Sequence, residues 1–285
     1  MKTEMKKYPN PWKTGFRKFL KNAPAVIAAV IFILITVSCI LAPVITDGDY
    51  TSFKVSERLS GFTREHPLGT DDLGRDMLTR LLYGGRATLK IAFTALVCGG
   101  LAGSAIGIIS GYFGGKSDTL IMRLVEALSS VPVILLVVAV ECAWGWGKGN
   151  YMYAIAISFI PVFAKVIRAA VMDIVGNEYI EAARALGGNH ITIIFRHIIR
   201  NIAAPFIVQL SSSAAEALLT CTIMGYIGFG LNPPLPKWGS IVAGNYNLIR
   251  SRPELALVPC LLVVVCAMSL NFIGNGLRDA FAPEK

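Results

Sequence analysis

The segment Ser-Gly-Tyr-Phe-Gly-Gly-Lys-Ser at residues 110–117 comes within one residue of a nucleotide-phosphate loop. Such a loop has the pattern G-x-x-x-x-G-K-[ST], in which backbone amides and a lysine bind phosphate oxygens. Ser110 stands where the first glycine is required, and the segment follows an apolar run instead of a buried strand. We therefore interpret it as a tight turn containing Lys116, and we expect this chain to bind no ATP itself.

Three carboxylates lie close together in a polar stretch, at Asp71, Asp72 and Asp76. Clustered carboxylates are typical calcium ligands, but their spacing here matches no calcium loop. Arg75 and Arg80 also offset their charge. We therefore expect a turn that leads into an amphipathic helix, and no metal site.

Charged residues inside apolar runs need a reason to be there, because burying a charge in lipid is costly. Arg123 and Glu126 are three residues apart and can pair on one helix face. Glu141 is near the end of its run, where it can reach the membrane interface. Glu216 lies deeper, among small residues that allow close helix packing. We expect Glu216 to face either the interior of a helix bundle or a translocation path.

The six cysteines lie in or beside apolar runs, and none forms a Cys-x-x-Cys pair. This pattern predicts neither a zinc site nor a disulfide framework, and we expect small buried hydrophobic side chains. No pair of residues suited to catalysis is visible either. The expectation is a chain with no catalytic residue, no metal and no cofactor of its own.

The elements that carry these residues are strongly apolar. Of the 285 residues, 54% are hydrophobic and 16% are charged, whereas soluble domains have roughly 25% charged residues. The apolar residues form runs near twenty residues long, enough to cross about 30 Å of hydrocarbon as helices. Backbone groups in lipid must bond internally, and the runs lack the period-two alternation of a barrel. We predict an all-α membrane protein with six transmembrane helices, at roughly 23–45, 87–112, 119–143, 151–172, 202–224 and 256–276.

Basic residues predict the orientation of these spans. Seven of them precede the first span, which is the pattern of a cytoplasmic N-terminus: Lys2, Lys6, Lys7, Lys13, Arg17, Lys18 and Lys21. Six spans return the C-terminus to the same side. The net charge of +9 is therefore assigned to the membrane surface, and no nucleic-acid partner is expected. Trp144, Trp146 and Trp238 are expected at the outer interface, where amphipathic rings prefer to lie.

On this prediction the chain has three parts. Residues 1–22 form a cytoplasmic N-terminal segment, with an amphipathic helix on the inner membrane surface at 11–22. Residues 23–86 form the first transmembrane helix and a long extracytoplasmic loop. Residues 87–285 form a core of five transmembrane helices with a polar cytoplasmic element at 178–197.

The first half of the 178–197 element reads as a short, slim helix. Asn177 suits its N-cap, and Glu181 in the first turn suits the positive end of the helix dipole. Glu181 can also pair with Arg184. Ala182 and Ala183 favour the helix and keep it narrow.

The second half reads as a bend followed by another helix. Gly187 and Gly188 end the first helix, and Asn189 can cap the second. The second helix carries an apolar stripe at helical spacing, at Ile191, Ile194, Phe195 and Ile198. A slim helix held out by a bend is well shaped to enter a groove on another protein, and a simple connector would be far shorter.

Residues 181–187, Glu-Ala-Ala-Arg-Ala-Leu-Gly, resemble the EAA motif of bacterial ABC importer permeases. Residues 66–86, HPLGTDDLGRDMLTRLLYGGR, resemble the segment after the first span in the C-type subunit of the dipeptide/oligopeptide/nickel branch. Residues 228–240, GFGLNPPLPKWGS, and 271–281, NFIGNGLRDAF, are similar to patterns of that branch. The four motifs occur in the family's order, and the resemblance covers nearly the whole chain.

The resemblance implies the type I fold of ABC importer permeases, with both termini in the cytoplasm of a prokaryotic cell. It implies a multi-pass subunit of the cytoplasmic membrane that forms half of a path for peptides, nickel or a related small solute. The implied partners are a homologous permease subunit, two cytoplasmic ATPases that bind the ATP, and an extracytoplasmic substrate-binding protein. The EAA-type helix would dock into the ATPase through Glu181, Ala182, Ala183 and Gly187.

Two departures and two rival interpretations remain. Residues 224–230, MGYIGFG, differ from a more usual Ser-Phe-Leu-Gly form, and one rival is a membrane scaffold or intramembrane enzyme, for which no catalytic pair is visible. The family usually continues its coupling motif with Leu-Pro, where this chain has Ile199 and Arg200, so the bend before the fifth span is expected near Pro205 instead. The other rival is a self-contained, ion-coupled secondary transporter, which would need ionisable residues buried near the membrane midplane. Glu216 is the candidate for such a residue.

Overall fold

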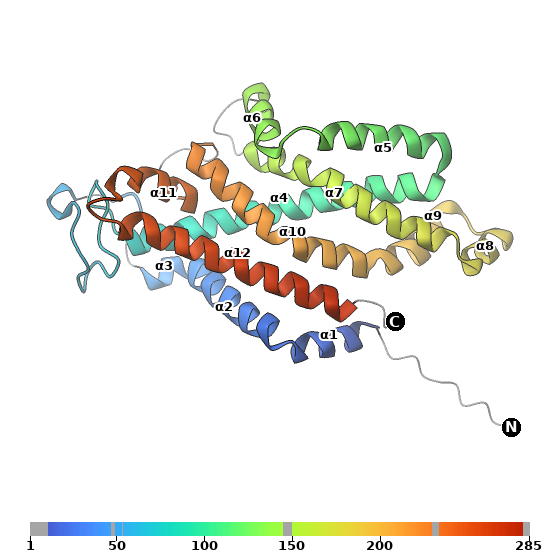
Figure 1. Ribbon diagram of the computed structural model, residues 1–285, viewed down its shortest axis with the longest axis horizontal. Coiled ribbons are helices and arrows are strands. Elements are labelled where there is room, and N and C mark those ends of the chain that lie inside the picture. The colour runs from blue at the N-terminus through green and yellow to red at the C-terminus, as the bar shows by residue number, and fades with distance from the viewer. Residues whose placement is uncertain (1–10, 47–48, 53, 145–149, 230–233, 282–285) are drawn as a thin grey trace.

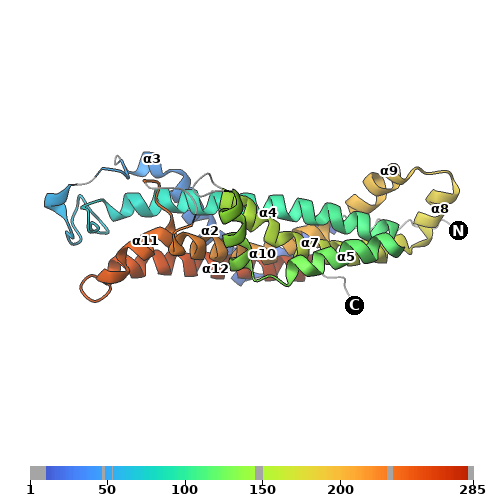
Figure 2. The ribbon, with the colours of Figure 1, turned by 90° about the horizontal axis from the view of Figure 1, so that it is seen from above.

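The computed structural model describes residues 11–46, 49–52, 54–144, 150–229 and 234–281, and these residues form helices, turns and loops. The helices lie along a common direction in an elongated, flattened bundle (Figures 1 and 2). Their bounds are α1 Pro11–Lys21, α2 Ala23–Ile40, α3 Ala42–Ile45, α4 Met77–Phe113, α5 Gly115–Ser129, α6 Val133–Trp144, α7 Asn150–Val175, α8 Glu178–Ala185, α9 His190–Ile193, α10 Ile199–Ile227, α11 Trp238–Asn245 and α12 Glu254–Phe281. A π-helical turn, Ile194–Ile198, joins α9 to α10, and short 3₁₀ turns occur at Val55–Glu57 and Tyr246–Leu248.

Five stretches of described helix are long and apolar enough to cross a membrane: α2, α4, α7, the continuous helix His190–Ile227, and α12. They correspond to five of the six predicted spans. The third predicted span, 119–143, is not one helix, because α5 and α6 meet at 92°. Pro132 lies at the break, and the residue before a proline is driven away from helical geometry. The six-span fold therefore holds only if this bent pair is counted as one span.

The closest helix packing joins α4 to α7. Glycines recur every four residues on the α4 face toward α7, at Gly99, Gly103, Gly107 and Gly111. A Cβ on Gly99 would lie 2.1 Å from the carbonyl oxygen of Ala156, and a Cβ on Gly111 would lie 2.9 Å from that of Arg168. Only glycine permits this approach, which is how helices gain van der Waals contact in lipid. The stripe makes α4 and α7 a single stiff unit.

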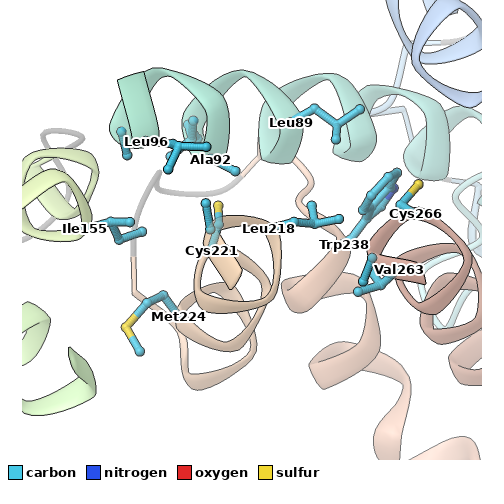
Figure 3. Packing of buried hydrophobic residues seen from close by; sticks show 14 of the residues in the cluster. Leu89, Ala92, Leu96, Ile155, Leu218, Cys221, Met224, Trp238, Val263 and Cys266 are labelled. Carbon is cyan, nitrogen blue, oxygen red and sulfur yellow. The ribbon is translucent and has the colours of Figure 1, made fainter. Parts of the chain in front are cut away.

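The main core lies where α2, α4, α7, α10, α11 and α12 meet. Trp238 is fully buried in it, and its indole Nε1 donates to the carbonyl oxygen of Leu81 at 2.9 Å. Figure 3 shows this ring between Leu218 and the α12 residues Val263 and Cys266. Trp238 was expected at the membrane interface with its ring in contact with headgroups, whereas α11 buries the ring in the protein core. Trp144 is exposed, and Trp146 lies outside the described residues.

The cysteine prediction holds for half of the set. Cys39, Cys221 and Cys266 are buried free thiols, whereas Cys98, Cys142 and Cys260 are exposed on this chain. Exposure of apolar surface on a membrane helix means contact with lipid or with another subunit. The described residues contain no group of three or more His, Cys, Asp or Glu side chains arranged to hold a metal ion.

The polar stretch before α4 forms the expected turn. Asp71 accepts hydrogen bonds from the backbone amides of Leu73 and Arg75, each at 2.9 Å. Asp76 caps α4 by accepting from the backbone amide of Thr79 at 2.7 Å. The predicted amphipathic helix exists but is continuous with the second span, since α4 begins at Met77.

The N-terminal amphipathic helix is present as α1, which packs against the end of α12. Its Phe16 and Leu20 are exposed, as expected for a helix on a membrane surface.

Candidate functional site

The 178–197 element forms one end of the molecule. It follows the end of α7 and leads into α10, so α8 and α9 project beyond the bundle (Figures 1 and 2). The loop before α4 and helix α11 lie at the opposite end. The element therefore stands where a partner can reach it without contacting the apolar middle of the bundle.

The first helix forms as predicted, but two of its expected side-chain contacts do not. Asn177 has the extended backbone of an N-cap, yet its amide nitrogen donates to the carbonyl oxygens of Asp173 and Ile174 at the end of α7. No ion pair joins Glu181 to Arg184 among the described residues. The Arg184 guanidinium instead lies 5.3 Å from the centre of the Tyr112 ring. Glu181 is thus exposed and available to a partner.

Each glycine of the bend is required for a separate reason. Gly187 has a φ of +83°, a left-handed conformation that strains other residues. Gly188 has an ordinary φ, but a Cβ there would lie 2.6 Å from the carbonyl oxygen of Ala183. The Gly188 amide donates to that same oxygen at 3.0 Å, which closes the end of α8. Asn189 caps α9 as expected, accepting from the Ile191 amide at 3.3 Å.

The predicted apolar stripe is shifted on the second helix. Ile193 and Ile198 are buried, whereas Ile191 and Phe195 are exposed. Ile193 and Ile198 are five residues apart, and the π-helical turn Ile194–Ile198 places residues at that spacing on one face. The stripe prediction assumed ordinary α-helical spacing. It is confirmed at Ile198 and, in part, at Ile194, and it is wrong at Ile191 and Phe195.

A small separate core anchors the element to the bundle. It combines three buried isoleucines of the element and its exit with side chains of α4, α7 and α10: Ile180, Ile193, Ile198, Tyr112, Ile167, Val171 and Ile202. Burying large aliphatic side chains contributes roughly 1.5–3 kcal/mol each. The element is therefore a packed extension of the bundle and not a free loop.

A polar contact ties the element to the end of α4. The Tyr112 hydroxyl and Nδ1 of His190 are hydrogen-bonded at 2.8 Å, and the two rings meet edge to face with centroids 5.6 Å apart. Nearby, Arg168 on α7 donates twice to Asp118 on α5, at 2.6 Å from Nε and 2.5 Å from Nη2. The end of α4, the start of α5, the C-terminal half of α7 and the element are thus held together. Sequence reasoning did not find Tyr112, His190 or this ion pair.

The outward surface of the element is apolar at its tip. Leu186 is 89% exposed, Phe195 is 68% exposed and Ile191 is 63% exposed. Large apolar groups exposed on a projecting element are typical of an interaction surface. Glu181 and Ala182 are also exposed, whereas Ala183 is half-buried under Gly188. We name the exposed set Leu186, Ile191 and Phe195 the apolar tip.

The other predicted residues lie elsewhere. Glu216 is exposed on α10, on the side that also exposes Leu219 and Ile223, so it does not face the interior of this chain's own bundle. Arg123 and Glu126 on α5 are exposed, and no ion pair joins them in the described part of the chain. Their predicted pairing is wrong.

Two further predictions concern single residues. Lys116 follows two glycines with positive φ, +63° at Gly114 and +59° at Gly115, so the near-match to a phosphate loop is a turn between α4 and α5. Glu141 does not reach the interface but is buried at the end of α6.

Comparison with known proteins identifies the chain. Residues 103–285 match the family model of the binding-protein-dependent transport system inner membrane component. The chain belongs to this family. Residues 10–61 match the N-terminal transmembrane domain of oligopeptide transport permease C, which places the permease in the dipeptide/oligopeptide branch of ABC importers.

Full-length relatives agree with this placement. The permease is 36% identical over 275 residues to the dipeptide transport system permease protein DppC of Alkalihalophilus pseudofirmus, covering 96% of this chain and 90% of that one. It is 33% identical to the di/tripeptide transport system permease protein DppC of Pseudomonas aeruginosa, covering 97% and 93%. It is 32% identical to the glutathione transport system permease protein GsiD of Pectobacterium atrosepticum, covering 96% and 91%.

A solved structure supports the fold. The permease superposes on a chain of the inward-facing MetNI methionine ABC transporter with a TM-score of 0.59 and 19% identity, covering 73% of this chain and 98% of that one. The predicted fold, a helical ABC importer permease, is therefore confirmed, and the family and its apolar helices make it a multi-pass protein of the inner membrane.

Proposed function

We propose that this permease forms half of the translocation path of an ATP-driven peptide importer and receives force through the 178–197 element. The observation that carries the proposal is the rigid projection of that element with an exposed apolar tip, at the junction of α7 and α10. The proposed partners are a homologous permease subunit, two cytoplasmic ATPases and an extracytoplasmic binding protein. The three relatives above are named for peptides, which favours a peptide over nickel as the cargo.

Docking would follow from the chemistry of the exposed surface. Leu186, Ile191 and Phe195 would enter an apolar groove on the ATPase, and Glu181 would meet a basic rim. Burying three large apolar side chains provides affinity, and a rim charge sets orientation. The ATPases would supply all nucleotide chemistry, and this chain would supply no catalytic residue.

Force would pass from the element into the bundle by rigid contacts. ATP-driven closure of the ATPases would move the element, and its buried isoleucines would carry α7 and α10 with it. Because the glycine stripe packs α4 closely against α7, a displacement of α7 would also displace α4. A relative shift of packed helices is a common form of such transitions. Because Glu216 lies on the exposed side of α10, the shift would reorient its face, which we propose lines the path against the partner permease.

Orientation is tested by labelling intact cells in a variant from which the native cysteines have been removed. A membrane-impermeant thiol reagent should label a cysteine at Thr63, in the loop before α4, and should leave a cysteine at Asn189 unlabelled. Both positions are exposed in the structure, so access to the residue is not limiting. Labelling of Asn189→Cys from outside would contradict the cytoplasmic position of the element.

Energy coupling is tested in proteoliposomes that contain both permeases and both ATPases. Uptake of a labelled dipeptide should require ATP and the binding protein and should persist when ionophores abolish ion gradients. Uptake by this chain alone, driven by an ion gradient without ATP, would instead establish the secondary-transporter alternative. This chain purified alone should hydrolyse no ATP.

A further inference from the structure

The end of the molecule opposite the 178–197 element contains a cavity of about 260 Å³ whose lining includes two arginines and a lysine. It lies where the start of α4, the end of α10 and the start of α11 meet. The residues that the argument uses are Arg75, Arg80, Gly225, Gly228, Lys237 and Ser240. A Cβ on Gly228 would meet nothing within 4 Å, so this glycine borders open space. The volume of the cavity is below the roughly 300–1,000 Å³ of pockets for drug-sized molecules, so the cavity suits a small group.

Arg80 is the unusual member of this lining. It is only 7% exposed, yet its Nε and Nη1 atoms have no hydrogen-bond partner among the described residues. The carboxylate that approaches it most closely is Asp71, whose Oδ2 lies 3.5 Å from Nε, beyond a good hydrogen bond. A buried donor left without an acceptor is costly, and a buried charge is more so.

The nearby acidic groups are already engaged or do not reach Arg80. Asp71 accepts from two backbone amides and, at 2.7 Å, from Nε of Arg75. Asp72 makes no hydrogen bond to Arg80 in the described part of the chain. The guanidinium groups of Arg75 and Arg80 therefore both lie beside the Asp71 carboxylate, which is already hydrogen-bonded. Arg80 keeps N–H donors that have no acceptor among the described residues.

Lys237 contributes little to the cavity through its ammonium group. Its Nζ donates to the carbonyl oxygen of Phe229 at 2.8 Å and lies 5.1 Å from the centre of the Tyr151 ring. Burial lowers the pKa of Lys237, and the Glu141 carboxylate opposes that shift. Among the described lining residues, the buried side-chain nitrogens with no hydrogen-bond partner at all are thus those of Arg80.

We propose that this cavity binds one carboxylate group, with Arg80 as its principal ligand. The Nη1–Nη2 edge of a guanidinium presents parallel N–H donors that match the two oxygens of a carboxylate, which a monatomic ion or a neutral group does not. On Arg80 the Nε atom is directed toward Asp71, so this edge, whose Nη1 has no partner among the described residues, is the one that would bind the carboxylate. If the 178–197 element is cytoplasmic, as the proposed function requires, the cavity opens on the extracytoplasmic side. The carboxylate would then come from the C-terminus of a peptide cargo or from an acidic side chain of the docking protein.

The test uses the purified full chain in dodecyl maltoside and follows its unfolding temperature, Tm. Sodium acetate replaces sodium chloride at constant ionic strength, and acetamide serves as the neutral isostere. Acetate should raise the Tm of the native chain by about 2 °C or more at several times its dissociation constant, because a ligand of the folded state stabilises it. Acetamide should not.

Three variants separate the site from general salt effects. Arg80→Gln should lose the acetate-induced rise in Tm. Arg80→Lys keeps the positive charge but lacks the planar guanidinium, so its rise in Tm should be less than half that of the native chain. Arg58→Gln is the matched control, because Arg58 is exposed in the same loop and does not line the cavity. An equal acetate response in the native chain and Arg80→Gln, or none in the native chain, overturns the proposal. If Arg80→Gln does not accumulate, Arg80→Lys and the acetamide comparison still decide it.

A dipeptide distinguishes the two sources of the carboxylate. Ala-Ala that raises the Tm at lower concentration than acetate, with no effect of its C-terminal amide, assigns the site to cargo. A response to acetate but not to Ala-Ala assigns it to an acidic side chain of the docking protein. None of these measurements needs ATP, transport or a partner, so a negative result leaves the proposed permease function standing.

Discussion

The Tyr112 hydroxyl and Nδ1 of His190 lie 2.8 Å apart although 78 residues separate them in the chain. The contact joins the end of α4 to the first turn of α9. It is a hydrogen bond between the projecting element and α4, a helix that does not lead directly into the element. A displacement of the element is therefore expected to reach α4 by this contact as well as through α7.

Tyr112→Phe tests this link. The substitution keeps the ring beneath Arg184 and beside His190 but removes the hydroxyl. A hydrogen bond of this kind contributes about 0.5–1.5 kcal/mol, so ATP-driven dipeptide uptake should fall roughly 2- to 10-fold. Membrane insertion and recovery of the ATPases in a pull-down should not change. The control is Tyr246→Phe, since Tyr246 is exposed at the opposite end of the molecule. Equal uptake by the two variants would mean that the hydroxyl carries no coupling.

Glu181→Lys tests docking. No ion pair holds Glu181 in the described part of the chain, so its replacement should leave the fold intact and act on the partner interface. A lysine in the first turn also opposes the helix dipole. Uptake should fall by about an order of magnitude, and substrate should no longer stimulate ATP hydrolysis in the reconstituted complex. The control is Glu65→Lys, a charge reversal in the loop before α4. Normal stimulation in Glu181→Lys would leave this residue without a role in docking.

Gly187→Val tests the direction of α8. A β-branched residue at a φ of +83° costs roughly 1–2 kcal/mol or more, so the bend should open. The spans should remain folded, because their packing does not involve this turn. We expect normal insertion, normal pairing with the partner permease and a loss of uptake similar to that of Glu181→Lys. Gly176→Val is the matched control, since Gly176 lies in the preceding turn without a positive φ. If Gly187→Val and Gly176→Val show equal uptake, the geometry of the bend is not required for transport.

Local chemistry made much of this architecture predictable. The spans follow from the length of the apolar runs, and the helix–bend–helix element follows from Gly187, Gly188 and Asn189, whose roles depend on adjacent backbone. The break between α5 and α6 could have been predicted from Val131 and Pro132. It was missed because the apolar run continues across the proline. The length of an apolar run indicates whether it can span a membrane, but it does not show whether the helix bends.

The remaining features depend on residues that are distant in the sequence. Trp238 suits a membrane interface by its chemistry, but the α11 turn carries it into the core. The stripe prediction failed at Ile191 and Phe195 because a π-helical turn changes which residues share a face, and nothing in the sequence marks that turn. Arg80 was interpreted as a counter-charge for nearby aspartates. Only the structure places Asp71 out of good hydrogen-bonding range of Arg80.

Gly103→Ala tests the packing of α4 on α7. An added Cβ would lie 2.4 Å from the carbonyl oxygen of Ile160, which is backbone and cannot rotate away. Overpacking of this kind costs about 1–3 kcal/mol, so the Tm of the purified chain should fall by several degrees. Gly244→Ala is the control, because a Cβ there would meet nothing within 4 Å. A Tm for Gly103→Ala equal to that of the control would show that α4 and α7 can move apart without loss of stability.

The loop before α4 should show a pH dependence centred on His66. Its Nδ1 and Nε2 atoms each lie 3.0 Å from a carboxylate oxygen, of Asp76 and of Glu57. The Asp76 hydrogen bond is the main cause that raises the pKa of His66 above its ordinary value of 6.5, and the Glu57 hydrogen bond adds to it, while partial burial opposes the shift. A histidine whose pKa is higher in the folded than in the unfolded state stabilises the fold fully below the unfolded pKa, and this contribution is lost as the pH rises through the folded pKa.

Amide hydrogen exchange in the loop residues 54–76 should therefore be more strongly protected at pH 6 than at pH 8.5, after correction for the intrinsic pH dependence of exchange. His66→Gln keeps some hydrogen bonding but cannot be protonated, so its protection should no longer change across this range. Thr63 and the backbone around it provide the reporter, because its hydroxyl accepts from the His66 amide at 2.9 Å. Protection that increases from pH 6 to pH 8.5 in the native chain would reverse the expected sign and rule out a protonated His66 as the bridge between the two carboxylates.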